Sequence, residues 1–251
     1  MEILFTICGR AGSKGFKNKN LKYLAGKPLV HFALAMIDIY QQKHPEHNCT
    51  TCLNTDSNEL VELTTKLNPS VKIVERKPEL ATDTVGKIEV IRDSFLQLER
   101  EDNIFDLIID LDLTSPLREV SNLEELIDEH LKNLDKDVYF SVVSARRNPY
   151  FNMVKRIENE VTIVNKSRYT SRQQTPEVFE MNASMYSFKP EFLKKKSNYI
   201  FDGQCGIIKM RDYLILDIDS EEDFKWLEFL FPKFLEDSSE LQDIYNYLYR
   251  R

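Results

Sequence analysis

A loop near the N-terminus combines glycines with cationic side chains in a way that could bind phosphates. It reads Gly9-Arg-Ala-Gly-Ser-Lys-Gly15, is followed by Lys17, Lys19 and Asn20, and comes directly after the apolar run Ile3 to Ile7. Glycine lets the backbone turn tightly and bring its N–H groups close to an anion, while Arg and Lys supply positive charge for a triphosphate. The spacing matches neither the Walker A pattern nor the dinucleotide fingerprint. The alternative interpretation is a solvated basic turn.

A pair of carboxylates near the C-terminus has spacing that suits a metal ion. Asp217 and Asp219 flank Ile218 at the end of the apolar run that begins at Leu214. We expect Leu214 to Ile218 to form a strand, whose alternation would point both carboxylates to one side of the sheet. Like charges this close repel unless a cation lies beside them, and oxygen ligands suit Mg²⁺ bound with phosphates. The alternative is a strand end whose carboxylates face water or cap the helix near Ser220.

Polar segments elsewhere could complete a binding site. Thr114 to Arg118 follows the apolar run Phe105 to Leu113, and ligands of open α/β sheets bind beyond the carboxyl ends of strands. The segment Arg168 to Gln173, with Asn182 further along, offers arginine forks that suit a carboxylate. The alternatives are a plain turn marked by Pro116 and a solvated loop.

The elements that must position these residues alternate between apolar runs and helical periodicity. We predict strands at Ile3–Ile7, Cys49–Asn54, Val71–Val74, Phe105–Leu113, Val138–Ser144, Ala183–Phe188 and Leu214–Ile218. We predict helices at Leu29–Lys43, Ser57–Leu67 with Ser57 as cap, Thr84–Arg100, Ser121–Leu134 with a capping box from Ser121 to Glu124, and Glu221–Leu230. This alternation indicates an α/β fold with a Rossmann-like, mostly parallel sheet flanked by helices and joined by right-handed crossovers.

A polar segment interrupts this rhythm at about residues 145–181. It is rich in Arg, Asn and Lys and contains short β-like pieces at Met153–Ile157 and Val161–Val164. We interpret residues 1–251 as a single domain that carries this segment as a small β-rich insert. Polar, extended inserts of this kind often pack on a partner subunit.

Composition excludes several classes of protein. The 251 residues include 34 Lys and Arg against 41 Asp and Glu, a net charge of −7, which argues against a nucleic-acid factor held by phosphate contacts. The apolar runs fall short of the roughly 18 residues that span a bilayer, so we expect no membrane anchor. The N-terminal MEILFTICGR has no basic n-region and no small-residue cleavage site, so we expect a cytoplasmic protein.

The motifs described above, in their order along the chain, resemble the acylneuraminate cytidylyltransferase family, the CMP-sialic acid synthetases. The opening motif of the family looks like P-A-R-G-G-S-K-G, followed by K-N and G-K-P-L. The matching segments are Cys8–Gly15, Lys19-Asn20, Gly26–Leu29, Glu75–Asp83, Thr114–Arg118, Arg172–Phe179, Asn182–Phe188 and Asp217–Asp223. Together they cover the chain from about residue 3 to residue 230.

The resemblance implies a nucleotidyltransferase fold and a Mg²⁺- or Mn²⁺-dependent reaction of CTP with a nine-carbon 2-keto-3-deoxy sugar acid of the sialic, legionaminic or pseudaminic type. It also implies a homodimer in which the insert completes the neighbouring site. Three alternatives remain open: a CMP-Kdo synthetase, whose opening loop lacks GSKG, another sugar nucleotidyltransferase that uses UTP or GTP, and a non-catalytic nucleotide-binding module. A binding module would not need the adjacent carboxylates Asp217 and Asp219.

The resemblance also implies a role for each matching residue. Arg10, Lys14, Lys19 and Asp217 would be catalytic. The CTP phosphates would lie on Arg10, Ser13, Lys14 and Lys19, and the nucleoside on Asn20, Arg76 and Asp83. The sugar acid would lie near Asp112, Arg172, Gln173 and Asn182, with Lys155 and Arg168 reaching the neighbouring site and Asp217 and Asp219 holding the metal.

This chain departs from the family pattern beside these residues. Cys8-Gly9 replaces Pro-Ala, Asp112-Leu113 replaces Gln-Pro, and Ala183 replaces Gly. Because that Gln lies near the sugar in relatives, the sugar pocket is expected to differ.

Overall fold

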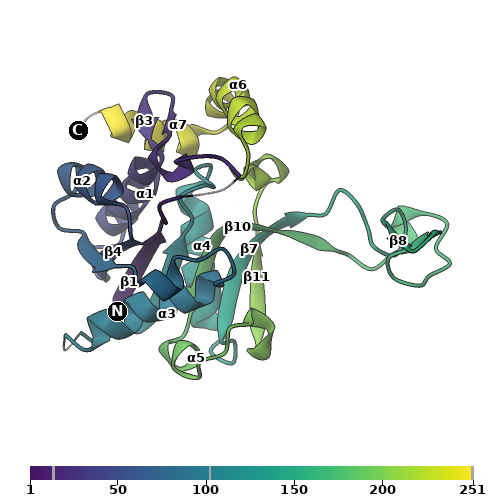
Figure 1. Ribbon diagram of the computed structural model, residues 1–251, viewed down its shortest axis with the longest axis horizontal. Helices are drawn as coiled ribbons and strands as arrows, with labels where there is room; N and C mark the ends of the chain where they lie inside the picture. The colour runs from purple at the N-terminus through teal and green to yellow at the C-terminus, as the bar shows by residue number, and fades with distance from the viewer. Residues whose placement is uncertain (13–14, 102, 250–251) are drawn as a thin grey trace.

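A twisted sheet forms the centre of the computed structural model, which describes residues 1–12, 15–101 and 103–249 (Figure 1). Within these residues the sheet has seven strands in the order β11-β7-β10-β6-β1-β4-β5. Their bounds are β1 Glu2–Cys8, β4 Asn48–Thr55, β5 Lys72–Glu75, β6 Leu107–Leu111, β7 Val138–Ser144, β10 Phe179–Phe188 and β11 Cys205–Lys209. β10 runs antiparallel to β6 and β7, and the other pairs are parallel. The predicted mostly parallel α/β fold is confirmed.

Helices cover both faces of the sheet. The helices are α1 Leu29–Lys43, α2 Asn58–Leu67, α3 Lys87–Glu99, α4 Val120–Lys132, α5 Pro190–Lys194, α6 Glu221–Asp237 and α7 Ser239–Tyr249. Strand alternation divides the core, because Phe5 and Ile109 pack with α1, α4, α6 and α7, whereas Leu4 and Ile108 pack with α3 and α5. Short 3₁₀ turns lie at Lys19–Leu21, Pro78–Leu80, Arg172–Gln174, Ile200–Asp202 and Asp212–Ile215.

Local sequence signals explain most helix starts. The Ser57 hydroxyl accepts a hydrogen bond from the Leu60 amide at 3.2 Å and caps α2, as predicted. The predicted capping box from Ser121 to Glu124 is wrong. α4 begins at Val120 and is capped by Glu119, whose amide donates to the Asn122 side chain at 3.1 Å. The predicted cap, Ser121, and the observed cap, Glu119, lie only two residues apart in the chain.

The predicted strand Leu214–Ile218 is also wrong. Asp212–Ile215 forms a 3₁₀ turn, and the residues after it are not paired into the sheet. Leu214 packs into the core from this turn, and Ile218 packs into it from the segment that follows. The sheet edge is formed instead by β11, which pairs with β7 and which the sequence reasoning missed.

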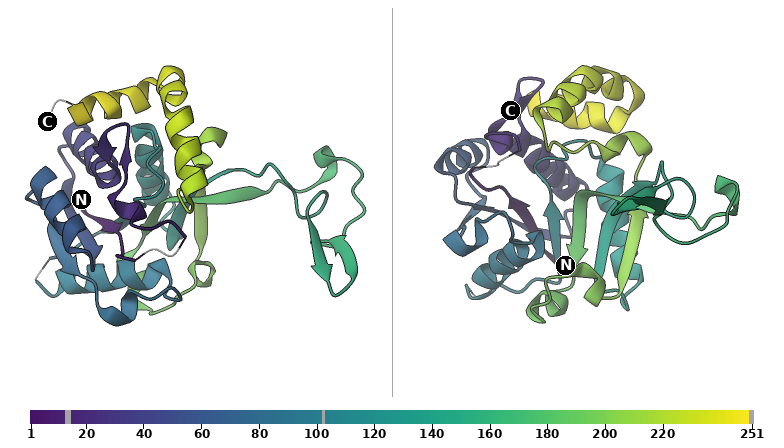
Figure 2. Two further views of the ribbon diagram at one scale, coloured as in Figure 1. Left: turned by 45° about the horizontal axis from the view of Figure 1, so that its top comes forward. Right: turned by 45° about the vertical axis from the view of Figure 1, so that its right-hand side comes forward.

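The segment between β7 and β10 leaves the body of the molecule as an arm. β8 Val154–Ile157 and β9 Glu160–Ile163 pair antiparallel near its tip (Figures 1 and 2). A smaller hairpin, β2 Tyr23–Leu24 with β3 Lys27–Pro28, follows the N-terminal loop. Among the described residues, the structure has no helix with the length and apolar run required to cross a membrane.

Candidate active site

A polar cleft opens at the carboxyl ends of β1 and β6. Its walls come from the loop after β1, the segment that precedes α3 and the end of β6. Six of the predicted site residues line it: Arg10, Lys19, Asn20, Arg76, Asp83 and Asp112. Ser13 and Lys14, predicted to bind phosphate, lie outside the described residues. The cleft has the position that open α/β sheets favour for ligands.

The loop after β1 is held by contacts at both of its ends. The Ala11 amide donates to Asp56 Oδ1 at 2.7 Å, and the Asn20 side chain donates to the Arg10 carbonyl at 2.9 Å. A Cβ at Gly15 would lie 2.8 Å from the carbonyl oxygen of Asp219, so only glycine allows this approach. The cationic loop is therefore packed against the segment that carries the predicted metal ligands.

The arginines of the cleft are oriented by neighbours. Arg10 forms an ion pair with Asp83 at 2.7 Å. Arg76 is buried and donates to the side chain and the carbonyl of Asn54 at 2.8 and 3.1 Å. Burial lowers the pKa of Arg76, although this guanidinium stays charged at neutral pH. Fixed cations of this kind suit a ligand with several anionic oxygens.

Lys87 also lines this cleft, although it was not among the predicted site residues. It pairs with Asp110 at 2.6 Å and also with Asp112. Burial opposes ionisation of Asp112, but the Lys87 charge and hydrogen bonds from Thr114 outweigh it and lower the Asp112 pKa to about 2. The signal in the sequence was Asp110, a charge inside an apolar strand, because such a charge is rarely buried without a partner.

Asp217 and Asp219 lie close to this cleft but face different surroundings. Asp217 Oδ1 accepts from the Ile218 amide at 2.8 Å and from the Ser115 hydroxyl at 3.3 Å. Burial raises the pKa of Asp217, and the negative charges of Asp112 and Asp219 act in the same direction. Asp219 is exposed and pairs with Lys19 at 2.9 Å. The expected strand alternation of the two carboxylates is therefore wrong.

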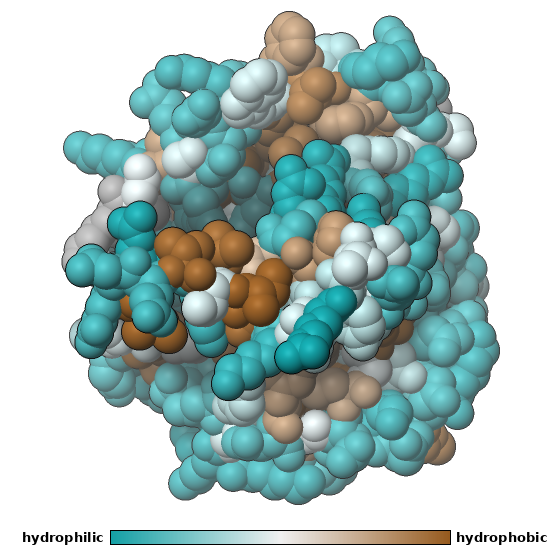
Figure 3. All heavy atoms as spheres, turned by 90° about the vertical axis from the view of Figure 1, so that its right-hand side faces the viewer, coloured by the Kyte–Doolittle hydropathy of each residue, from teal (hydrophilic) through white to brown (hydrophobic). Residues whose placement is uncertain are grey.

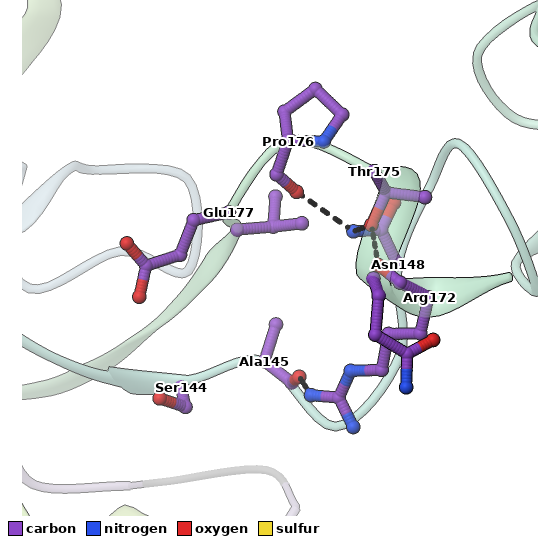
Figure 4. A pocket seen from close by; sticks show the side chains of 9 residues that line it. Ser144, Ala145, Asn148, Arg172, Thr175, Pro176 and Glu177 are labelled. Carbon is purple, nitrogen blue, oxygen red and sulfur yellow. Dashed lines mark hydrogen bonds between the residues drawn. The ribbon is translucent and has the colours of Figure 1, made fainter. Parts of the chain in front are cut away.

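Arg172 and Gln173 line a different pocket, at the base of the arm. Figure 4 shows the Arg172 guanidinium pointing at the Ala145 carbonyl, to which it donates at 2.6 Å. The Asn148 side chain fixes the wall of this pocket. It donates hydrogen bonds to the Thr175 hydroxyl at 2.9 Å and to the Pro176 carbonyl at 3.1 Å. The structure thus places the predicted carboxylate-binding pair outside the cleft at the ends of β1 and β6.

Asn182 is enclosed in the protein. Its side-chain oxygen accepts from Ser141 at 2.6 Å, and its amide nitrogen approaches Met210 Sδ at 3.2 Å. It lies where the register of β10 against β7 shifts, next to Ala183 with a φ of 52°. A sugar could reach the side-chain amide of Asn182 only by replacing these contacts.

Lys155 and Arg168 belong to the arm. Lys155 lies in β8 and is exposed, and the arm carries both residues away from the body of their own chain (Figure 2). A site that uses them must therefore be completed by another copy or by a large movement of the arm.

The fold and the cleft define a nucleotidyltransferase. A mostly parallel α/β sheet presents a cationic glycine loop after its first strand, opposite carboxylates at the end of a central strand. Such a site can neutralise a triphosphate and place acidic groups near its α-phosphate.

Comparisons with known proteins agree with the nucleotidyltransferase class and identify a family within it. The cytidylyltransferase family model matches residues 4–249. The chain is 36% identical over 230 residues to the CMP-N,N'-diacetyllegionaminic acid synthase of Campylobacter jejuni, covering 91% of this chain and 94% of the relative. The same identity and coverage hold for the post-translational flagellin modification protein B of Campylobacter coli. The chain therefore belongs to the cytidylyltransferase family, which confirms the predicted resemblance.

A solved structure gives the same fold. The CMP:2-keto-3-deoxy-manno-octonic acid synthetase complexed with CTP superposes with a TM-score of 0.64 over 93% of this chain and 99% of that chain. Its sequence identity is 12%, so the likeness concerns the fold.

Proposed function

We propose that this enzyme transfers the cytidylyl group of CTP to a nine-carbon 2-keto-3-deoxy sugar acid. The anomeric 2-hydroxyl attacks the α-phosphorus, a new P–O bond forms, the bond to the β-phosphate breaks, and pyrophosphate leaves. The hydroxyl proton is released to solvent. The observation that carries this proposal is the cleft that combines Arg10, Lys19 and Arg76 with Asp112 in a cytidylyltransferase chain. Among the possible sugars we favour diacetyllegionaminic acid, the sugar named for the relative with 36% identity.

The cationic side chains act on the triphosphate. Arg10 and Lys19, together with Ser13 and Lys14 of the same loop, would hold the phosphates and offset the charge that develops as pyrophosphate departs. Asn20, Arg76 and Asp83 would hold the nucleoside. Alignment and charge neutralisation can supply most of the rate, so this chemistry does not need a covalent intermediate.

We propose Mg²⁺, or Mn²⁺, as the ion held by Asp217 and Asp219. The donor set fits a hard cation, because burial and neighbouring Asp112 disfavour the charge of Asp217 unless a positive charge lies beside it. When bound, such an ion polarises a phosphoryl oxygen. The Lys19 ammonium donates hydrogen bonds to the Asp219 carboxylate and to the Ile218 carbonyl. These bonds hold the segment Ile218-Asp219 against the cationic loop.

The sugar acid would lie between the cleft and the arm. Asp112 offers a carboxylate to its hydroxyl groups, and Arg172 with Gln173 is proposed to bind its carboxylate. Because Asp112 is ionised and held by Lys87, it acts as a hydrogen-bond acceptor at neutral pH.

We also propose that two copies form a homodimer through the arm. A lone two-stranded hairpin is marginal in water, yet this one exposes Met153, Val154, Ile157 and Val161. Figure 3 views the molecule from the arm side and displays a group of apolar side chains among polar ones. Contact with a second copy would cover such side chains and bring Lys155 and Arg168 to the neighbouring site. We place the reaction in the cytoplasm, where CTP is available.

The experiment is pyrophosphate release from CTP and Mg²⁺ with N-acetylneuraminate, diacetyllegionaminate, pseudaminate or Kdo. Parallel reactions contain UTP or GTP. We expect release with CTP and diacetyllegionaminate, and at least about tenfold less with the other sugars, which is the scale of discrimination that a few pocket contacts provide. Release with Kdo alone would favour the alternative enzyme. CTP binding without release from any sugar would favour a non-catalytic module.

A further inference from the structure

The turn between α1 and β4 brings together side chains that bind metals. It reads His44-Pro-Glu-His47, and the ligand atoms of His44, Glu46 and His47 lie within 4.8 Å of one another. Glu46 Oε1 is 3.4 Å from His44 Nδ1 and 3.9 Å from His47 Nε2. Two imidazoles and one carboxylate form a donor set that suits zinc-class ions.

The second nitrogen of each imidazole has its own partner. His44 Nε2 lies 2.9 Å from Glu124 Oε1 of α4, and His47 Nδ1 lies 2.7 Å from the hydroxyl of Tyr40. Such partners fix the tautomer of a metal-binding histidine and aim its other nitrogen at the ion. Here they leave His44 Nδ1 and His47 Nε2, the nitrogens that face Glu46, as the ligand atoms.

The rings are held in place before any ion binds. Tyr40 is buried in the core and stacks on His44 with ring centroids 4.6 Å apart and on His47 with ring centroids 5.9 Å apart. Glu46 is exposed, so water can reach the open side of the cluster.

We propose that His44, Glu46 and His47 bind one divalent ion of the zinc class, with water completing its coordination. The turn precedes β4, where Asn48 pairs with Glu2, whereas the nucleotide cleft lies at the opposite end, where Asn54 pairs with Cys8. The site is therefore separate from the cleft. A bound ion would join the end of α1 to the start of β4 and stabilise the N-terminal half of the sheet.

Calorimetric titration of untagged, chelator-treated protein with Zn²⁺ tests the site. We expect one ion per chain, and at least about tenfold weaker binding for His44→Gln, His47→Gln and the exposed Glu46→Gln. Asp217→Asn and Cys49→Ser should bind Zn²⁺ as the wild type does, which separates this site from the cleft and from the nearby thiol. Zn²⁺ should also raise the melting temperature of the wild type more than that of Glu46→Gln.

Circular dichroism checks the fold of each variant. If a histidine variant does not fold, the comparison of Zn²⁺ affinity between the wild type and Glu46→Gln decides the test. Equal Zn²⁺ affinity in the wild type and Glu46→Gln, or no Zn²⁺ binding by the wild type, would overturn the proposal. Because Glu46 is far from the cleft along β4, CTP turnover should not change in this variant, whatever the result of the titration.

Discussion

In the cleft that the structure describes, two carboxylates at the end of β6 share the positive charge of Lys87. It pairs with Asp110, which is fully buried, and with Asp112. Replacing Lys87 with Met leaves both carboxylates without this partner. We expect the free energy of unfolding to fall by about 3–5 kcal/mol, the range for a buried pair that loses one member.

Urea unfolding measures this loss. The double variant Lys87→Met/Asp110→Asn is the matched control, because it removes the buried charge together with its partner and should recover much of the stability. If Lys87→Met alone unfolds at the wild-type urea concentration, the ion pairs do not stabilise the fold.

Residue types located part of the described cleft, whereas the role of each residue there stays a prediction. Arg10, Lys19 and Asp83 meet in one cleft, as the glycine loop and the family resemblance suggested. Lys87 was missed because it stands at the start of a helix, where lysines are ordinarily solvated. The departures at Gly9 and Leu113 also make sense only in three dimensions, since a Cβ at Gly9 would lie 2.5 Å from the Leu113 side chain.

At the scale of elements, His130 makes the packing of α4 sensitive to pH. It is a buried residue of α4, contacts the Ser187 hydroxyl of β10, and its Nε2 lies 3.2 Å from the Lys136 carbonyl. Burial lowers the His130 pKa to about 4 from its ordinary 6.5. Below pH 6.5 the unfolded chain takes up a proton that the folded chain resists, so stability falls as the pH drops from about 6.5 to about 4.

Across this pH range we expect the free energy of unfolding to fall by about 3 kcal/mol in total. Urea unfolding at pH 7, 6 and 5 measures it, with His130→Gln as the comparison. The variant should lose less stability than the wild type over this range. Equal losses in the two proteins would show that His130 is not the titrating group.

The predicted elements match the structure where the apolar pattern of the sequence and the burial of the side chains both result from the same helix or strand. α1 and β7 have the predicted bounds, since the stretch from Leu29 to Ile37 is buried on all sides of the helix and Val138–Ser144 is covered on both faces. Leu214–Ile218 failed because apolar spacing reports burial and cannot distinguish a strand from a 3₁₀ turn that packs into the core. Cys205–Lys209 has a weak strand signal of its own, and its pairing with β7 is a tertiary effect.

At the scale of the whole molecule, the proposed homodimer would make each site depend on two chains. If Arg168 reaches the neighbouring cleft, Arg168→Ala and Asp217→Asn inactivate different halves of one composite site. Each homodimer should then have little activity. Mixing equal amounts through a dissociation step should restore about a quarter of the wild-type rate, because half of the dimers are mixed and each has one intact site.

Steady-state turnover after mixing measures this recovery, and light scattering gives the oligomeric state. A mixture of Asp217→Asn with Asp217→Ala is the control and should stay inactive. Two outcomes would contradict a composite site: no recovery from stable dimers, or wild-type activity from a monomer.

The most direct test of the account is kcat/KM for CTP in Asp217→Asn, measured with the preferred sugar acid. The nearby Asp212→Asn is the matched control, because Asp212 is an exposed carboxylate five residues earlier in the chain. We expect kcat/KM to fall by a factor on the order of 10²–10³ in Asp217→Asn, with unchanged folding, and to stay near normal in the control. A near-normal value for folded Asp217→Asn would contradict the assignment of this cleft as the site of cytidylyl transfer.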